Sequence, residues 1–321
     1  MDLVAVDIGG THARFCRAAI APDGAITLGE PETLHIRNHA SFQTAWDDFR
    51  GRQGGSLPPR MAMAIAGRFG GEVIRFTNNP WTIRPAQLGV EAFAIVNDFE
   101  AVAHAVARAP DEEFLHLAGP DEPLHQDGTI SVLGPGTGLG VAHLWRGDGK
   151  YRVQATEGGH IDFAPLDSID DAILARLRKR HNRVSVERVV SGPAIGDLYR
   201  TLAALENRAT REEDDVALWT RALDGSDPLA AAALDRFCLT LGSVAGDIAL
   251  AQGGFGGVVI AGGLGYRLRE HLPKSGFAER FRAKGRFAEL MATIPVKLIT
   301  HPQPGLFGAA AAFHRQHGYT E

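Results

Sequence analysis

The chain has 321 residues, 45% of them hydrophobic, and a formal net charge of -5 from 33 basic and 38 acidic side chains. This length exceeds the size at which one hydrophobic core usually stops growing, so we expect two lobes. The small net charge excludes a global attraction to nucleic acid or to an anionic membrane, and it favours a small-molecule partner.

The cysteines and the first residues bear on location. Cys16 and Cys238 form no CxxC motif and no Cys/His cluster, so the sequence predicts neither a structural zinc site nor a disulfide framework. The chain starts without a basic flank and reaches Asp2 before any apolar signal-peptide core. We therefore expect a reduced, cytoplasmic protein with no nucleic-acid or membrane partner.

The chain begins with a predicted hairpin. Residues 3–6 form a buried strand, residues 7–11 (DIGGT) a tight turn, and residues 13–18 a return strand, and a turn at 22–24 leads to a third strand. The 38 glycines are about 12% of the chain against a typical ~7%, and they cluster beside strand-like runs. Such clusters are typical of turns where the backbone approaches another group closely.

A strand at residues 94–97 runs into a helical pattern that follows Asp98. Asn97 and Asp98 stand at this junction, where Asn and Asp commonly cap the first turn of a helix. A strand end also delivers side chains to a site, so a catalytic acid or base stays open beside the cap. The acidic residues 111–113 interrupt the helical pattern, and we place a domain boundary near Pro110.

The first hairpin recurs in the middle of the chain. With Thr137 aligned on Thr11, residues 130–133 match the first strand, 134–136 the first turn and 140–144 the return strand. A turn at 147–149 again leads to a third strand. The repeat predicts a duplicated core.

Helical patterns dominate the rest of the chain. Residues 228–252 place apolar side chains on one face at helical spacing, and residues 304–317 form an alanine-rich terminal helix. The uncharged stretch 248–266 is long enough for a membrane span, but its glycines and Gln252 indicate a helix end, a turn and a buried strand at 257–261.

Alternating strands and helices with a repeated hairpin predict an α/β fold of two lobes with a cleft between them. The small lobe would comprise residues 1–110, with the terminal helix of about 304–321 packing back on it. The large lobe would comprise residues 111–303.

The glycine turns match neither common phosphate motif. Residues 134–140 (GPGTGLG) lack the lysine of a P-loop, and Leu139 stands at the sixth position of a dinucleotide fingerprint. A glycine hairpin turn still presents successive N–H groups as an anion-binding nest, and Thr11 and Thr137 add hydroxyls, so two such turns suit a polyphosphate. Asp7 would hold Mg²⁺ directly or through water. The alternative is that the turns only close hairpins.

These segments carry a resemblance to a known family. Residues 7–14 (DIGGTHAR), 134–144 (GPGTGLGVAHL) and 261–263 (AGG) resemble the phosphate hairpins and the adenosine turn of sugar kinases in the actin/hexokinase superfamily. Residues 157–163 (EGGHIDF) and 185–193 (SVERVVSGP) resemble, more narrowly, bacterial glucokinases of the zinc-free type, and the resemblance covers nearly the whole chain. It implies an actin-like, ribonuclease H-like ATPase fold, ATP-dependent phosphorylation of glucose at the 6-hydroxyl, and a homodimer.

The resemblance also implies site residues. Asn97 would orient the sugar, Asp98 would be the general base for the 6-hydroxyl, and Glu157, His160 and Glu187 would bind other hydroxyls. The residues implied for ATP and its magnesium ion are Asp7, Gly9, Gly10, Thr11, Gly136, Thr137, Gly138, Gly262 and Gly263. His12 stands where the family commonly has Asn, and Pro135 where it has a small residue such as Ala.

Other interpretations stay open at this point. His160 alone would suit a structural or metal-linked histidine, and Glu187 beside Arg188 an exposed ion pair. The whole chain would also suit a kinase for another hexose or an amino sugar, a nonenzymatic sugar sensor, or an actin-like filament or chaperone ATPase. A sensor would have no need of Asp98 or Asp7.

Overall fold

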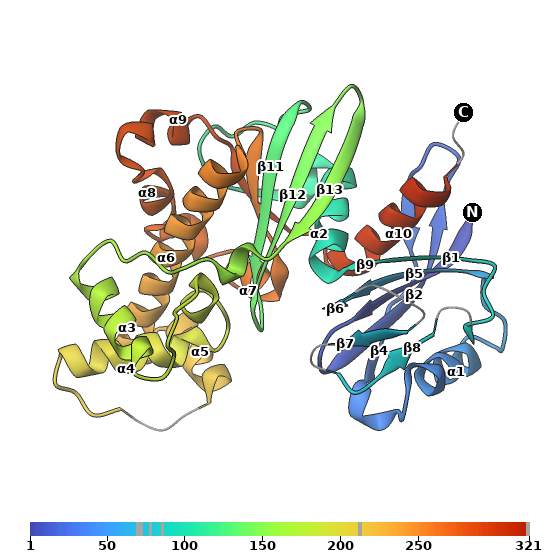
Figure 1. Ribbon diagram of the computed structural model, residues 1–321, viewed down its shortest axis with the longest axis horizontal. Helices are drawn as coiled ribbons and strands as arrows, with labels where there is room; N and C mark the ends of the chain where they lie inside the picture. The colour runs from blue at the N-terminus through green and yellow to red at the C-terminus, as the bar shows by residue number, and fades with distance from the viewer. Residues whose placement is uncertain (69–72, 77–78, 85–86, 211–213, 319–321) are drawn as a thin grey trace. The chain divides into compact units, whose positions relative to one another are not determined.

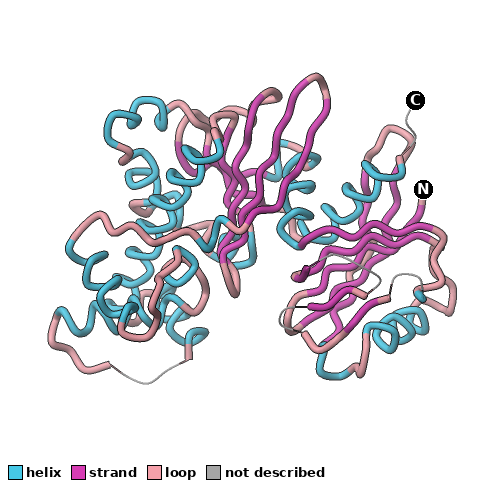
Figure 2. The backbone as a smooth tube through the Cα atoms, viewed as in Figure 1, coloured by secondary structure: helices cyan, strands magenta, loops and turns pink. Residues whose placement is uncertain are grey.

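The computed structural model describes residues 1–68, 73–76, 79–84, 87–210 and 214–318. The chain divides into two compact units: unit 1 holds Met1–Ala109 and His301–Glu321, and unit 2 holds Pro110–Thr300. Figure 1 labels many of the helices and strands, and Figure 2 shows that each unit contains a sheet with helices packed against it.

Unit 1 is built on a mixed sheet with the strand order β3-β2-β1-β5-β9 and with β4 also paired to β2. β1, β5 and β9 are parallel, and β2 returns antiparallel to β1. The register aligns Ile8, Ile65 and Asn97, so these three parallel strands end at one edge of the sheet. The strands are β1 Asp2–Ile8, β2 His12–Ile20, β3 Ile26–Leu28, β4 Glu32–His35, β5 Arg60–Ile65 and β9 Ala92–Asn97.

Other elements cover both faces of this sheet. Successive residues of β1 point to opposite sides, so the strand contributes apolar side chains to both faces. Val4 and Val6 pack with helix α1 (Phe42–Arg52) and with a small sheet of β6 (Gly67–Arg68), β7 (Ile74–Phe76) and β8 (Thr82–Ile83). Leu3 and Ala5 pack on the other side with the terminal helix α10 (Pro304–His317) and with Ala101 of α2 (Asp98–Arg108). The short 3-10 helix η1 (Ile36–Asn38) follows β4.

Unit 2 repeats this plan with the strand order β10-β15-β14-β11-β12-β13. β11, β12 and β13 form an antiparallel meander, and β14 and β15 run parallel to β11. The order β13-β12-β11-β14-β15 therefore matches β3-β2-β1-β5-β9 in both neighbours and direction, and the predicted duplication is confirmed. The strands are β10 Phe114–Ala118, β11 Gly128–Pro135, β12 Leu139–Gly147, β13 Lys150–Thr156, β14 Gly257–Ile260 and β15 Val296–Ile299.

Helix α6 (Pro228–Gln252) is the central helix of unit 2. Asp227 caps its start by accepting the N–H groups of Leu229 and Ala230, and Gly253 ends it in the left-handed conformation. The predicted helix is confirmed and its predicted apolar face is buried, but residues on its other sides are buried as well. Among the described residues α6 has the length and composition of a membrane span. However, 78% of its most apolar 18-residue stretch is buried inside the protein, as in the core helix of a soluble protein.

The other helices of unit 2 surround α6 or follow the strands. The α-helices are α3 Ser168–Arg178, α4 Ala194–Leu205, α5 Asp215–Asp224, α7 Gly262–Arg267, α8 Phe277–Arg282 and α9 Ala288–Ala292. The 3-10 helices are η3 Asp111–Glu113, η4 Gly158–His160, η5 Val186–Arg188, η6 Leu272–Lys274 and η7 Gly285–Phe287.

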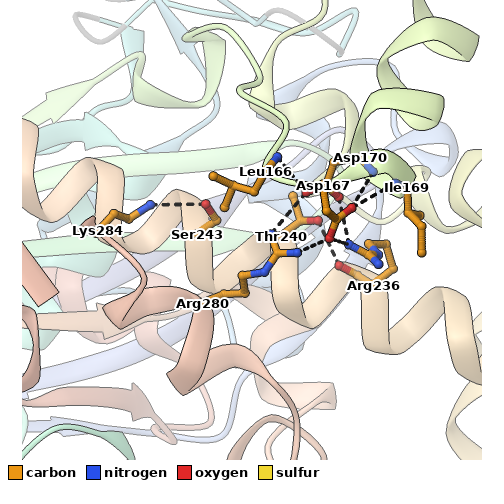
Figure 3. Close-up of polar contacts among 9 residues, drawn as sticks. All are labelled: Leu166, Asp167, Ile169, Asp170, Arg236, Thr240, Ser243, Arg280 and Lys284. Atoms are coloured by element: carbon orange, nitrogen blue, oxygen red, sulfur yellow. Dashed lines mark hydrogen bonds and ion pairs between the residues drawn. The ribbon is translucent and has the colours of Figure 1, made fainter.

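A largely buried ion-pair network ties α3 to α6 and α8 (Figure 3). Arg236 of α6 donates to Asp167 at 2.7 Å and to Asp170 at 3.2 Å, and Arg280 of α8 binds the same two carboxylates. Asp167 is also the N-cap of α3. The side chain of Asp170 is only 3% exposed, and the two arginines compensate for the cost of burying its carboxylate.

Candidate active site

The carboxyl edge of the unit 1 sheet holds the carboxylate predicted for metal binding. Asp7 stands near the end of β1, its side chain is 21% exposed, and it accepts a hydrogen bond from Arg14 Nη1 at 3.1 Å. Burial raises the pKa of Asp7, Arg14 opposes that shift, and the nearby Asp98 carboxylate adds to it. A carboxylate with these neighbours is favoured in its charged form by a bound cation.

The donors at Asp7 fit Mg²⁺. In phosphoryl-transfer sites Mg²⁺ is usually held by one or two carboxylates, with water and substrate phosphates completing the shell. Within the described ranges no group of three or more His, Cys, Asp or Glu side chains is placed to hold a metal ion. Asp7 with Asp98 nearby suits the open arrangement that Mg²⁺ uses, and it does not suit a closed protein cage.

The first turn of α10 lies directly against Asp7. A Cβ on Gly305 would come within 2.9 Å of Asp7 Cγ, so glycine lets the helix backbone approach the carboxylate. The N-terminal end of a helix carries partial positive charge, which stabilises an anion there.

Asn97 and Asp98 occupy the junction of β9 and α2. Asn97 Oδ1 accepts the N–H groups of Phe99 at 2.9 Å and of Glu100 at 3.2 Å, so the capping interpretation is correct for Asn97. Asp98 is the first residue of α2, and its Oδ1 accepts the Phe99 N–H at 2.9 Å. The cap fixes the peptide that carries Asp98, and a cap and a functional carboxylate coexist at this junction.

The turn Gly9-Gly10-Thr11 is braced by neighbouring backbone. The Gly9 N–H donates to the His12 carbonyl at 3.0 Å, and the Ile36 N–H donates to the Thr11 carbonyl at 3.0 Å. Gly10 and Thr11 are themselves exposed. The turn is therefore both fixed and open to a ligand.

The second glycine turn, in unit 2, is shorter than the sequence indicates. Gly134 and Pro135 belong to β11, where Gly134 pairs with Gly140, and residues 136–138 alone make the turn. The Gly136 carbonyl accepts the Gly192 N–H at 2.7 Å, and Trp219 Nε1 donates to the Gly192 carbonyl at 2.8 Å. The buried Trp219 thus anchors the turn through Gly192.

Gly262 lies against the end of β11, directly before this second turn. A Cβ on Gly134 would come within 2.6 Å of the Ala261 carbonyl oxygen, and one on Gly262 within 2.7 Å of the Pro135 carbonyl oxygen. Gly262 has a φ of 80° and starts helix α7 with Gly263, so the expected glycine turn is the first turn of a helix. The two segments predicted for nucleotide binding in unit 2 are therefore in contact.

Glu187 contacts the same turn. Its Oε2 accepts the Leu139 N–H at 2.9 Å, and a Cβ on Gly138 would overlap its carboxylate. The structure therefore gives Glu187 the Leu139 amide as a partner, in place of the exposed ion pair with the neighbouring Arg188.

Glu157 precedes the short helix η4, and His160 is its last residue. His160 Nε2 lies 3.8 Å from Glu157 Oε2, and the two side chains are 57% and 90% exposed. The η4 and η5 segments are joined by the Val186 N–H, which donates to the Ile161 carbonyl at 2.9 Å. This pairing places Glu157, His160 and Glu187 on adjoining segments of unit 2.

Several residues of these sites received no role from the sequence. Arg14 could have been found from the hairpin register, because a turn of known length places it opposite Asp7. Gly192 and Gly305 reach the sites by packing of segments far apart in the chain, for which the sequence offers no local signal.

Known proteins with related sequences and folds identify the family. A sequence model described as Glucokinase matches residues 3–316. The glucokinase of Zymomonas mobilis subsp. mobilis is 55% identical over 325 residues, which cover 100% of both chains. The glucokinase of Photorhabdus laumondii subsp. laumondii is 38% identical over 314 residues, covering 97% of this chain and 96% of its own.

A solved structure agrees with this result. The crystal structure of glucokinase from an Antarctic psychrotroph superposes with a TM-score of 0.85 at 32% identity, covering 98% of this chain and 99% of its own. The predicted actin-like α/β fold is confirmed by this likeness. Sequence and fold together show that the chain belongs to the glucokinase family.

Proposed function

We propose that this protein phosphorylates glucose at its 6-hydroxyl with ATP, giving glucose 6-phosphate and ADP. The observation that carries the proposal is the pair of carboxylates, Asp7 and Asp98, at the carboxyl edge of the unit 1 sheet beside the first glycine turn. The two are close enough for the charge of Asp98 to raise the pKa of Asp7. A metal-binding carboxylate and a proton-accepting carboxylate are both required by this reaction. Membership of the glucokinase family supports the choice of glucose and ATP.

The sugar is assigned to five polar side chains. Glu157, His160 and Glu187 would bind hydroxyls that do not react, and Asn97 would orient the sugar beside Asp98. Carboxylates and an imidazole make directional, charge-assisted hydrogen bonds to hydroxyls. A sugar that lacks one of these hydroxyls would leave a polar group without its partner, which gives strong discrimination.

Asp98 is assigned the reacting proton. The 6-hydroxyl oxygen attacks the γ-phosphorus, the bond from that phosphorus to the ADP oxygen breaks, and the hydroxyl proton passes to Asp98. A carboxylate with an ordinary pKa of ~3.9 is a weak base, so its position matters more than its basicity. Asn97 supplies that position through its cap on α2.

The nucleotide is assigned to the glycine segments. The turns containing Gly9, Gly10 and Thr11 and Gly136, Thr137 and Gly138 would donate N–H groups to phosphate oxygens, and Gly262 and Gly263 would lie beside the adenosine. Mg²⁺ at Asp7 would supply charge stabilisation to the phosphates when it is bound.

We also infer a cytoplasmic homodimer without a nucleic-acid or membrane partner. The net charge of -5 supports the absence of these partners. Light scattering of the purified protein would measure the mass: a value of twice the 34.4 kDa chain supports the dimer, and a value of 34.4 kDa contradicts it.

The closing test combines turnover with binding. Glucose- and Mg²⁺-dependent formation of glucose 6-phosphate is measured for the wild type and for Asp98→Asn, and glucose binding is measured by calorimetry. We expect turnover to fall by a factor of ~10²–10⁴ in the variant, which is the usual contribution of a general base. Glucose binding should be retained. Full turnover in Asp98→Asn would contradict the role of Asp98.

The same experiment separates the alternatives. Wild-type protein that binds glucose but never forms a phosphorylated sugar would favour the sugar sensor. A panel of hexoses and amino sugars gives the preferred substrate, and a higher kcat/KM for one of them would replace glucose in the proposal.

A further inference from the structure

Histidine and arginine side chains line one flank of the first glycine turn. His12 follows Thr11 directly and begins β2, and it pairs in register with His35 of β4, the two ring centroids lying 4.3 Å apart. Arg14 lies two residues along β2, so it is on the same face of the sheet as His12. Arg37 stands two residues after His35, in the 3-10 helix η1. These four residues form what we call the basic row.

The basic row continues the face of the sheet that carries Asp7. Asp7 is paired with Arg14 across the hairpin, and the same face of β1 and β2 is packed under α10 further from the turn. Along the edge of the sheet, the side chains change from acidic on β9–α2 and β1 to basic on β2 and β4. The charges of a metal–triphosphate complement this arrangement, because its cation would lie at Asp7 and its anionic oxygens at the basic row.

The surroundings of His12 disfavour its protonated form when no anion is present. Burial lowers the pKa of His12, and electrostatic repulsion from His35, Arg14 and Arg37 lowers it further. These are the charged groups that face it from β2, β4 and η1, while Asp7 of β1 is held by Arg14. A phosphate placed beside the imidazoles would reverse this effect, because an opposite charge favours the charged form.

We propose that His12 and His35 bind phosphate oxygens of the nucleotide beside the first glycine turn, so that nucleotide binding takes up protons at this pair of imidazoles. The inference rests on the proposed function, which assigns the phosphates to this turn. It adds two imidazole ligands, of which His12 replaces an asparagine that could not carry a positive charge. Nucleotide affinity would then rise as the pH falls through the titration range of histidine.

The test measures proton uptake directly. The Mg²⁺ complex of a nonhydrolysable ATP analogue is titrated into the protein by calorimetry at pH 6, 7 and 8, in buffers of different ionisation enthalpy. We expect the wild type to take up a fraction of a proton near neutral pH. Its affinity should fall between pH 6 and pH 8, by up to about tenfold for each unit by which the bound phosphate raises the pKa of His12.

Variants separate charge from folding. His12→Asn should lose the proton uptake and bind with a nearly flat pH profile, and His35→Gln should reduce the uptake. His12→Arg keeps the positive charge, so it should retain tight binding at pH 8. The exposed His125 of unit 2 provides the control, and His125→Gln should take up protons as the wild type does.

The outcomes distinguish this inference from the proposed function. Titration of the nucleotide itself is common to all variants, so only differences between proteins count. Proton uptake by His12→Asn equal to that of a wild type that phosphorylates glucose would overturn the inference alone. A wild type that binds no nucleotide and forms no glucose 6-phosphate would overturn both.

Discussion

Glu187 Oε2 accepts the backbone N–H of Leu139 at 2.9 Å, so a residue proposed to bind sugar is hydrogen bonded to the turn proposed to bind phosphate. Gly192, five residues further on, donates its N–H to the Gly136 carbonyl of the same turn at 2.7 Å. One segment, residues 185–193, therefore positions both Glu187 and the second glycine turn. Binding of the sugar and of the nucleotide should be coupled through this segment.

We expect Glu187→Ala to weaken the binding of both ligands. The variant loses a sugar contact, and it also leaves the Leu139 N–H without its acceptor, a loss of about 1–3 kcal/mol. Nucleotide affinity in the absence of sugar should therefore fall about tenfold or more. Calorimetry with glucose alone and with the Mg²⁺–nucleotide alone measures the two effects.

Glu157→Ala is the matched control for this prediction. Glu157 is also proposed to bind sugar, but its side chain is 90% exposed and lies near His160. We expect this variant to weaken glucose binding and to leave the nucleotide affinity measured without sugar unchanged. Unchanged nucleotide affinity in Glu187→Ala as well would show that the Leu139 bond does not hold the turn.

The network around Asp170 should be essential for the stability of unit 2 (Figure 3). Asp170→Asn removes the charge that Arg236 and Arg280 share within a site that is nearly closed to water. Breaking a buried ion pair in this way costs about 3–5 kcal/mol. Urea unfolding should show the loss, whereas the exposed neighbour Asp171 should tolerate Asn within about 0.5 kcal/mol. Equal midpoints for the two variants would contradict this account.

Local patterns in the sequence were sufficient for the fold and for part of the site. Short strand-like runs and glycine turns located both hairpins, and their alignment revealed the duplicated core that the strand orders confirm. The helix signal after Asn97 also predicted the cap that the structure contains. These features depend on residues that are near one another in the chain, so short-range rules apply to them.

Long-range contacts account for what the sequence did not reveal. The pairing of His12 with His35 requires β4 to add to β2, and the bond from Leu139 to Glu187 joins residues 48 positions apart. The burial of α6 on all sides follows from the helices and the sheet that surround it, and periodicity within one helix does not report on those neighbours. For the same reason Arg236 did not stand out as a partner of Asp170.

His104 makes the stability of unit 1 depend on pH. Its side chain is 3% exposed on α2, near Glu100, and burial, together with the charge of Arg315, lowers the pKa of His104 to about 4. The unfolded chain binds the proton near pH 6.5 and the folded chain does not. The free energy of unfolding is therefore unaffected by the titration of His104 above pH 6.5, and it decreases as the pH falls from 6.5 toward 4, because the unfolded chain then binds a proton that the folded chain does not.

To test this role of His104, urea unfolding of the wild type and of His104→Gln is measured at pH 8 and pH 5. The wild type should lose about 2 kcal/mol from this histidine between the two pH values, since each pKa unit corresponds to ~1.4 kcal/mol. His104→Gln should be less stable at pH 8, and its stability should depend less on pH by that amount. An identical pH dependence in the two proteins would rule out His104 as the source.

Gly308 sets the distance between α10 and α2, the two helices that begin beside Asp7 and at Asp98. A Cβ on Gly308 would overlap the Ala101 carbonyl oxygen, and because that atom is backbone it cannot turn aside. We expect Gly308→Ala to destabilise the protein by about 3 kcal/mol or more, at the upper end of the range for overpacked sites. Turnover should fall as well, because separating the helices moves Asp98 relative to Asp7.

The control for Gly308 is a helical glycine with free space around it. Among the described residues, no atom outside the backbone of α1 and the two neighbouring residues lies within 4 Å of a Cβ built on Gly51. Gly51→Ala should therefore stabilise the protein by up to about 1 kcal/mol through its greater helix propensity. Urea unfolding and turnover are measured for both variants. Opposite shifts in the unfolding midpoint, with turnover lost only in Gly308→Ala, would show that the helix crossing positions the two carboxylates. A stable Gly308→Ala protein with full turnover would show that α10 and α2 can separate without cost, and the close crossing would then have no part in the activity.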